Sequence, residues 1–528
     1  MELLLEPTCI TVPALLAERA ATRCEDPLLI CDDDILTYGE AVTRSSALAK
    51  GLLAVGAGKG THVGMLYPNG SAMVVAWLAA ARIGAVSVPL STFSSSGELR
   101  TLLRNADIEM LLSATSYRGR DFVETLHGAV ADIDSVKAPP ILSNEVPVLR
   151  RVVLELEPLV ESGAGIDDSL LAAAEGAVRP SDRMVIVHTS GSTSEPKGVI
   201  HQHGPLIRHV GNLNVLRDLG ADDVIFSNSP FFWIGGFAYS LLGTLIAGAT
   251  LVCSNATEAS ATLDLLERTR PTMVNGFAAA VAHLEKDPSF PDRDLTSIRR
   301  GNLWPIMPAS VRPVDPELRH NMLGMTEAGS VCLASADDSD QPEHRRGSFG
   351  RPVPGIQTMI IDLETGAECA VGEPGELWLR GPSLMEGYYG RERHETFTQD
   401  GWYRTGDLFH VDADGFHYFI GRHGDMIKTA GANVAPLEVE AAIADATGLI
   451  AHVVGVVDPT RGQLVAAAVR IPKGQVAPDE NELHGALRER LSAYKVPRRY
   501  LFLADDEIPL LSSGKLDARA LKEIFVGG

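Results

Sequence analysis

The chain has 528 residues, of which 45% are hydrophobic and 22% are charged. This length is too great for one hydrophobic core, so we expect roughly two to four folding units. The formal net charge of −22 argues against a general nucleic-acid-binding or anionic-membrane surface. An anionic ligand must therefore be bound by a local site. The six cysteines lack metal-ligand spacing and a disulfide framework, which favours a reducing cytosol.

The chain shows no targeting or membrane signal. Residues 1–7 contain acidic side chains and no basic segment, so no secretory signal is expected. The most apolar segment, residues 71–88, is interrupted by Arg82 and Gly84, and a buried helix followed by a strand explains it better than a membrane span. We therefore predict a cytoplasmic protein without a membrane span.

Alternating helical and strand patterns follow the chain as far as residue 274. Helices are predicted at residues 12–23, 36–53, 72–82, 99–105, 236–246 and 259–269. Strands are predicted at residues 63–67, 86–89, 109–112, 184–187, 224–226, 250–253 and 272–274. Residues 132–147 are predicted to form a surface loop, and residues 347–379 a small β piece. The alternation predicts parallel sheets in two lobes of similar size.

Residues beyond Gly421 are predicted to form a separate unit of about a hundred residues, which is a usual domain size. Its expected elements are a strand-turn-strand at 425–434, helices at 436–446 and 480–491, and strands at 452–457 and 464–469. This order indicates a small α+β domain.

The segment 188–199, with the sequence His-Thr-Ser-Gly-Ser-Thr-Ser-Glu-Pro-Lys-Gly-Val, is the most informative stretch. It places five hydroxyl side chains and two glycines around Lys197. Glycine lets backbone N–H groups approach a ligand, hydroxyls are short donors, and lysine supplies compact positive charge, so the set suits phosphate oxygens. It is not a Walker A loop, because Gly198 follows the lysine. A flexible Ser/Gly loop is the alternative interpretation.

Three other motifs contain side chains suited to nucleotide chemistry. Thr326 and Glu327 place a hydroxyl beside a carboxylate, which suits a phosphate and its Mg²⁺, although Thr-Glu also starts helices. Asp407, on a turn, can accept two ribose hydroxyl hydrogen bonds, or it can be an ordinary turn aspartate. Lys515 follows a Ser-Ser-Gly turn, where a solvent-exposed lysine is the simpler reading.

The segment 188–199 resembles the phosphate loop of the adenylate-forming (AMP-binding) superfamily, and the other motifs extend the resemblance over almost the whole chain. The matching branch is that of acyl-CoA synthetases, or carboxylic acid–CoA ligases. The resemblance implies an α/β fold with an N-terminal adenylation domain, residues 1–421, of two βαβ-rich lobes plus a small β piece. A mobile α+β C-terminal domain, residues 422–528, would swing and carry the catalytic lysine.

The resemblance also implies a reaction. A carboxylic acid is activated by ATP to an acyl-adenylate and transferred to coenzyme A, with release of AMP and pyrophosphate and with Mg²⁺ as the metal. The implied partners are therefore the acid, ATP and coenzyme A, with no nucleic acid, and a homodimer is left open.

The resemblance assigns roles to individual residues. The catalytic residues would be Lys515, Thr326 and Glu327, with Glu327 as the metal ligand. The ATP- and AMP-binding residues would be Thr189, Ser190, Gly191, Ser192, Thr193, Lys197, Asn302, Leu323, Gly324, Met325, Thr326, Asp407 and Arg422. The acid pocket would be lined by Phe232, Trp233, Phe237, Phe277 and Trp304. Gly424 would be the hinge, and Gly431 would lie against the coenzyme A tunnel after domain rotation.

This chain departs from the family pattern at several positions. Ser194 replaces a usual glycine, Leu323 replaces the aromatic residue against adenine, and Trp233 stands where some members have histidine. Residues 301–305 replace a Gly-Ala-Pro-like segment, and Gly424 stands where Lys or Asp is usual. The charge-bearing residues are all retained, so these departures make the adenine and acid pockets unusual without removing the chemistry.

Two alternatives to the acid–CoA ligase stay open. One is an acyl-adenylate ligase that loads a separate carrier protein; about a dozen residues follow Lys515, so we expect no fused carrier domain there. The other is a nucleotide-binding homologue with impaired catalysis. The apolar candidate lining, to which Met325 also contributes, favours an acid with a hydrophobic body. Aryl, alicyclic, steroid-derived and medium-chain fatty acids fit equally.

Overall fold

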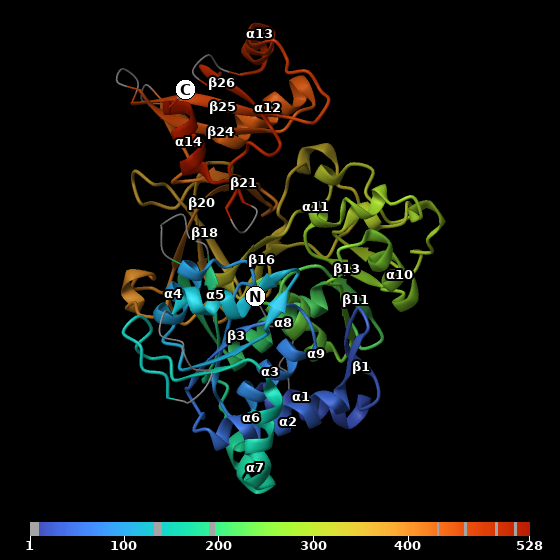
Figure 1. The fold of residues 1–528 in the computed structure, drawn as a ribbon. Helices are drawn as coiled ribbons and strands as arrows, with labels where there is room; N and C mark the ends of the chain where they lie inside the picture. The colour runs from blue at the N-terminus through green and yellow to red at the C-terminus, as the bar shows by residue number, and fades with distance from the viewer. Residues whose placement is uncertain are drawn as a thin grey trace. The chain divides into compact units, whose positions relative to one another are not determined.

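The computed structural model describes residues 10–130, 140–189, 196–429, 432–458, 462–491, 495–511 and 515–527 (Figure 1). The chain divides into two compact units. The first consists of Met1–Gln357 and Arg380–Gly401, and the second of Thr358–Leu379 and Trp402–Gly528. This division assigns residues 358–379 of the predicted small β piece to the second unit and residues 347–357 to the first. The functional boundary that we expect after Gly421 concerns which residues move during the reaction, and it stays a prediction.

The first six-stranded sheet of unit one has the order β10-β9-β4-β3-β5-β8. Its strands are β3 (His62–Leu66), β4 (Val86–Pro89), β5 (Met110–Ser113), β8 (Arg151–Val153), β9 (Arg183–Thr189) and β10 (Lys197–Gln202). All neighbours pair in parallel except β9 and β10, which are antiparallel. Every residue of β3, β4 and β5 is buried, as expected for a parallel sheet covered on both faces.

The second six-stranded sheet has the order β14-β13-β11-β12-β1-β2. Its strands are β1 (Pro27–Cys31), β2 (Asp34–Thr37), β11 (Val224–Ser227), β12 (Thr250–Cys253), β13 (Met273–Asn275) and β14 (Arg300–Gly301). The predicted pair of βαβ-rich lobes is confirmed. Two strands from the start of the chain, β1 and β2, however, complete one edge of this sheet, because β1 pairs in parallel with β12. Local patterns carry no information on such a distant pairing.

The α-helices of unit one include five that agree with the predicted ranges within a few residues (12–23, 38–54, 71–82, 96–105 and 259–269), whereas those at 122–129, 156–162, 168–177, 203–216 and 278–281 were not predicted. The α-helices of this unit are α1 (Val12–Arg23), α2 (Tyr38–Ala54), α3 (Ser71–Arg82), α4 (Ser96–Asn105), α5 (Phe122–Ala129), α6 (Leu156–Ser162), α7 (Asp168–Ala177), α8 (His203–Leu216), α9 (Gly243–Ala247), α10 (Ala259–Thr269) and α11 (Ala278–Val281). The predicted start of α2 at residue 36 is wrong, because Leu36 and Thr37 belong to β2. Thr37 ends the strand and forms a capping box with Glu40, so the helix begins at Tyr38.

A correction applies to the helix predicted at 236–246. Its first part, Gly235–Leu242, is a π-helix, and only Gly243–Ala247 is α-helical. A periodic apolar pattern does not separate the two over so few turns. Gly236 is required for the close approach of this helix to the preceding loop, because a Cβ atom there would lie 2.0 Å from the carbonyl oxygen of Pro230.

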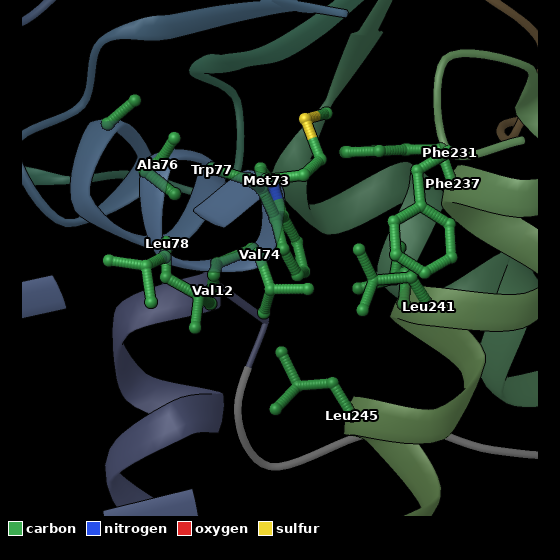
Figure 2. Packing of buried hydrophobic residues seen from close by; sticks show 14 of the residues in the cluster. Val12, Met73, Val74, Ala76, Trp77, Leu78, Phe231, Phe237, Leu241 and Leu245 are labelled. Carbon is green, nitrogen blue, oxygen red and sulfur yellow. The ribbon is translucent and has the colours of Figure 1, made fainter. Parts of the chain in front are cut away.

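Helix α3 lies in the main hydrophobic core, and all its residues except Ala72 are buried (Figure 2). Trp77 of α3 packs edge-on against Phe237 of the π-helix, with ring centres 5.2 Å apart. The apolar segment 71–88 is therefore core, as predicted. Among the described residues, no helix combines the length and the apolar character that crossing a membrane requires. Phe237 is completely buried in this core, and its predicted place in the acid pocket stays a prediction.

Unit one also contains a three-stranded antiparallel sheet of β15 (Leu323–Met325), β16 (Ser330–Ala334) and β17 (Arg351–Pro352). Of the loop predicted at 132–147, the described part, residues 140–147, contains no helix or strand. The short sheet is important because the turn between β15 and β16 contains Thr326 and Glu327.

Unit two contains two sheets. A four-stranded antiparallel sheet is formed by β18 (Gln357–Ile361), β19 (Gly375–Arg380), β20 (Tyr403–Val411) and β21 (His417–Arg422). The C-terminal sheet has the order β23-β22-β25-β24, and β26 pairs in parallel with β25. Its elements are β22 (Ile427–Thr429), β23 (Ala432–Val434), α12 (Pro436–Thr447), β24 (Ala451–Asp458), β25 (Gly462–Ile471), α13 (Glu480–Arg490), β26 (Arg499–Ala504) and α14 (Ala518–Gly527). The predicted α+β arrangement is confirmed, with β26 and α14 in addition.

Candidate active site

Strands β9 and β10 form the hairpin that carries the predicted phosphate loop. Thr189 at the end of β9 pairs with Lys197 at the start of β10, so the loop leaves and returns at one point on the sheet edge. Residues 190–195, which include the predicted loop residues Ser190, Gly191, Ser192 and Thr193 and the departure Ser194, lie outside the described residues. The hairpin supports a loop with a lysine at its base.

Thr326 and Glu327 form a single 3₁₀ turn, not the start of an α-helix. His201 of β10 donates from Nε2 to the carbonyl oxygen of Thr326 at 2.7 Å, and the amide of Met385 donates to the carbonyl oxygen of Glu327 at 2.8 Å. Burial lowers the pKa of His201 to about 4, opposed by its bond to Thr326, so the imidazole is neutral near pH 7. The turn is thus fixed to β10 through its backbone.

Residues 385–389 lie beside β10. Tyr388 forms an antiparallel bridge with Val199, and the amide of Tyr389 donates to the carbonyl oxygen of Gly198 at 2.7 Å. The hydroxyl of Tyr388 donates to Oε1 of Glu327 at 2.8 Å, and Nζ of Lys197 lies 5.1 Å from the centre of the Tyr388 ring. Three segments far apart in sequence therefore meet at one polar group. Sequence analysis missed Tyr388, because no charged motif marks the segment Met-Glu-Gly-Tyr-Tyr.

The side chains of Thr326 and Glu327 offer the hard oxygen ligands that Mg²⁺ prefers. Of the Glu327 carboxylate, Oε1 is bonded to Tyr388, while Oε2 has no hydrogen bond to any residue that the structure describes. Within the described ranges, no three His, Cys, Asp or Glu side chains gather closely enough to hold a metal ion. A single carboxylate such as that of Glu327 can hold Mg²⁺ together with phosphate oxygens, which is usual for this ion.

Two asparagine side chains form hydrogen bonds with the main chain after β13. Asn302 accepts from the amide of Gly276 at 3.0 Å and donates to its carbonyl at 2.9 Å, and Asn228 makes the same pair of bonds to Phe277, both at 2.9 Å. The predicted contact of Asn302 with the nucleotide stays a prediction, because its amide group is bonded to Gly276. The other predicted nucleotide-side residues, Leu323, Gly324 and Met325, lie on β15, with Gly324 exposed.

Four aromatic rings form one contact cluster in unit one, which we call the aromatic cluster: Phe93, Phe232, Trp233 and Phe277. Neighbouring ring centres lie 5.4–5.5 Å apart in edge-to-face contacts, apart from a looser 6.4 Å contact between Phe93 and Trp233. Phe93 and Phe277 are 41% and 51% exposed, so the cluster reaches the surface. Exposed aromatic area of this kind is suited to binding an apolar ligand.

The aromatic cluster contains three of the five predicted pocket residues. Of the other two, Phe237 is in the core, and Trp304 packs against a separate core cluster beside α10 and β13. Phe93 was missed, although it follows β4 closely, and the loops after strands β11 and β13 carry the other three rings. Side chains beyond the carboxyl ends of parallel strands are where α/β proteins bind ligands, and that rule could have pointed to Phe93.

In unit two, Asp407 and Arg422 face each other on β20 and β21. Nε of Arg422 donates to Oδ1 of Asp407 at 2.8 Å; the aspartate is buried and the arginine is exposed. Lys515 is also exposed. A Cβ atom at Gly424 would meet no atom within 4 Å, and Gly431 lies outside the described residues. The structure thus joins the two predicted ribose residues, while the hinge and tunnel roles stay predictions.

Comparison with known proteins identifies the family. The model of the AMP-binding enzyme family matches residues 16–389, and the model of the AMP-binding enzyme C-terminal domain matches residues 438–515. The chain belongs to the AMP-binding enzyme family. The two matches also agree with the predicted order of a large N-terminal and a small C-terminal part.

Relatives match nearly the whole chain. The mouse mitochondrial medium-chain acyl-CoA ligase ACSF2 is 28% identical over 94% of this chain and 84% of its own length. A feruloyl-CoA synthase from Amycolatopsis sp. is 31% identical over 91% and 92% of the two chains. The solved structure of O-succinylbenzoate coenzyme A synthetase (MenE) from Bacillus subtilis with ATP and a magnesium ion has a TM-score of 0.78 and 26% identity, covering 96% and 99% of the two chains. The predicted family, α/β fold and general reaction, ATP-dependent acyl-CoA ligation, are confirmed.

Proposed function

We propose that this AMP-binding enzyme activates a carboxylic acid with a bulky hydrophobic body and transfers it to coenzyme A. The aromatic cluster of Phe93, Phe232, Trp233 and Phe277 carries the proposal on the acid. Its rings offer large apolar area and edge-to-face contacts, so an aryl or similarly bulky acid would gain most from it. One similar protein is named a feruloyl-CoA synthase and another a medium-chain ligase, and both names agree with a hydrophobic acid.

In the first half-reaction, a carboxylate oxygen attacks the α-phosphorus of ATP, and the bond to the pyrophosphate oxygen breaks. Such a displacement needs charge neutralisation and positioning more than covalent help. We assign Lys197 and Thr326 to the phosphates and Glu327 to Mg²⁺, which would neutralise phosphate charge when bound. The position of Lys197 opposite Thr189 and the bond between Glu327 and Tyr388 support these roles.

In the second half-reaction, the coenzyme A thiol attacks the acyl carbonyl carbon, a proton leaves the thiol, and AMP departs. We assign Asp407 to the ribose, because the ion pair with Arg422 holds one of its carboxylate oxygens in place. Gly424 as hinge and Gly431 beside the thiol tunnel complete the proposal. A hinge needs backbone freedom, and the open space around Gly424 is compatible with it.

The experiment measures acyl-CoA, AMP and pyrophosphate for a panel of aryl, alicyclic, steroid-derived and medium-chain acids, with and without coenzyme A. We expect acyl-CoA and AMP to form in equal amounts for a bulky hydrophobic acid, and pyrophosphate release without coenzyme A to stop near one turnover. Release of pyrophosphate with no acyl-CoA for any acid would favour the carrier-protein ligase. Nucleotide binding without pyrophosphate release would favour the impaired homologue.

The role of Lys515 is tested by separating the half-reactions. Replacing Lys515 with alanine removes a charge that would stabilise the adenylation transition state. We expect adenylation to fall roughly a hundred- to a thousandfold, as on loss of an oxyanion donor, while transfer from a presynthesised acyl-adenylate changes little. Rapid-quench measurement of pyrophosphate and of thioester provides both rates. Equal losses in both steps would contradict the assignment.

A further inference from the structure

We propose that Tyr388 is a positioning residue that sets both charges of the phosphate and metal end of the site. Its hydroxyl would orient the carboxylate of Glu327, and its ring would hold the ammonium group of Lys197. The inference rests on the proposed function, because it takes Glu327 as the metal ligand and Lys197 as a phosphate ligand. The two effects come from different parts of one side chain and can be removed separately.

The hydroxyl of Tyr388 donates to Oε1 of Glu327 at 2.8 Å. A hydrogen bond to an ionised acceptor is stronger than one between neutral groups, and it restricts rotation of the carboxylate. With Oε1 occupied, the second oxygen, Oε2, is the one left for a cation. Partners that orient a metal-binding side chain in this way commonly change metal affinity by roughly tenfold to a hundredfold when removed.

The ring of Tyr388 makes a separate contact with Lys197. Nζ of Lys197 lies 5.1 Å from the ring centre, within the distance at which a cation is attracted to an aromatic face. Arg391 approaches the same ring, with Cζ 5.8 Å from its centre. Because a lysine side chain has a flexible four-carbon chain, an aromatic ring that restrains it reduces the conformational entropy lost when the lysine binds a phosphate.

Tyr388 is itself well fixed. It is 7% exposed, and its main chain pairs with Val199 of β10. On either side, Ile200 donates to the carbonyl oxygen of Gly387 at 3.1 Å, and Tyr389 donates to that of Gly198 at 2.7 Å. A side chain anchored to the same strand that begins with Lys197 can hold both charges in a constant relation. Pre-organisation of this kind is what electrostatic catalysis requires.

The experiment uses two substitutions of Tyr388 in the full-length protein. Tyr388→Phe removes only the hydroxyl, and Tyr388→Leu removes the ring as well. Mn²⁺ binding to the enzyme–ATP complex, followed by electron paramagnetic resonance, reports on the Glu327 end. ATP binding by calorimetry with EDTA and without metal reports on the Lys197 end.

We expect Tyr388→Phe to weaken Mn²⁺ binding roughly tenfold and to leave metal-free ATP binding unchanged. Tyr388→Leu should weaken Mn²⁺ binding to a similar degree and should also weaken metal-free ATP binding, by roughly fivefold at low salt. Unchanged Mn²⁺ binding in Tyr388→Phe would overturn the first half of the proposal. Unchanged ATP binding in Tyr388→Leu would overturn the second half.

A matched control is provided by the next residue. The hydroxyl of Tyr389 donates to Oδ2 of Asp107, also at 2.8 Å, and neither residue belongs to the proposed site. Tyr389→Phe therefore removes an equivalent hydroxyl–carboxylate bond from the same segment, and both binding measurements should stay at the parental values. An equal loss of Mn²⁺ binding in Tyr389→Phe would show a general loosening of the segment and would overturn the positioning role.

Failure of this inference is distinguishable from failure of the proposed function. Formation of acyl-CoA by the parental protein tests the function, and it does not depend on either Tyr388 variant. A parental protein that makes acyl-CoA while Tyr388→Phe binds Mn²⁺ normally would retain the function and lose the inference. Weaker Mn²⁺ binding in Tyr388→Phe, together with no acyl-CoA from the parental protein, would retain the positioning role and lose the function.

Discussion

The polar group around Glu327 and the aromatic cluster around Trp233 are built in different ways. In the polar group, β10, the turn at Thr326 and the segment at Tyr388 are joined by main-chain bonds and by two bonds from side chains, those of His201 and Tyr388. In the aromatic cluster, the rings belong to loops after three different strands and touch one another through side chains. The first arrangement is determined by backbone hydrogen bonds, and the second by ring packing.

We infer that the polar group serves the reaction steps that are the same for every acid, and that the aromatic cluster selects the acid. A backbone scaffold has one geometry, because each of its buried amides and carbonyls must be bonded, so it suits the steps that every acid shares. Rings on loops can be exchanged one at a time without disturbing a sheet, so they suit selection among acids. We therefore expect substitutions in the polar group to affect all acids equally and substitutions in the aromatic cluster to affect acids unequally.

The largest expected effect is that of Glu327→Gln, which keeps the size of the side chain and removes its charge. Adenylation should fall roughly a hundredfold, by the same factor for every acid tested, because the lost interaction is with the metal and the phosphates. The half-saturating Mg²⁺ concentration should rise in parallel. An unchanged Mg²⁺ titration would return Glu327 to a purely structural role, and losses that differ among acids would break the comparison.

The polar side of the comparison also predicts a response to acid, because buried histidines lie on β10 and α8. Burial, with a smaller contribution from His201, lowers the pKa of His209 from near 6.5 to about 4. Between these values the unfolded chain binds a proton and the folded chain does not. The stability contributed by the neutral ring is therefore complete above pH 6.5 and is lost as the pH falls towards 4.

His209→Leu removes this titration from a buried position. The shift corresponds to about 3 kcal/mol over that pH range. Thermal unfolding at pH 7.5 and pH 5 should show a smaller drop for His209→Leu than for the parental protein, with similar midpoints at pH 7.5. Identical drops in the two proteins would mean that His209 is already protonated in the folded state or is not buried in solution.

The smallest of the three effects is that of Trp233→Ala, and it is the most selective. Trp233 contacts Phe232, Phe277 and, more loosely, Phe93, so its loss opens the middle of the cluster. We expect kcat/KM to fall roughly tenfold to a hundredfold for the bulkiest acid accepted and much less for a small one. The KM for ATP should stay within about twofold. An equal fall in kcat/KM for all acids would mean that Trp233 acts in the steps that every acid shares and not in acid selection.

The sequence by itself was sufficient to place the chain in its family, because the motifs that carry the resemblance are contiguous. Lys197, Thr326, Glu327, Asp407 and Arg422 were named through that resemblance, and their individual roles stay predictions. Several helices and strands of both units were predicted as well, since apolar periods are local. The start of α2 was predicted at residue 36, however, and the capping box of Thr37 and Glu40 places it at Tyr38.

Only the tertiary structure decided which distant residues meet. Tyr388 carries no motif, and its importance comes from the pairing of its segment with β10, about 190 residues earlier. Phe93 joins the aromatic cluster, while Phe237, an equally aromatic residue, is taken up by the core beside Trp77. Residue type fixes what a side chain can do, but strand pairing and packing fix its neighbours. Those contacts depend on long-range closure of the chain, which a local pattern does not contain.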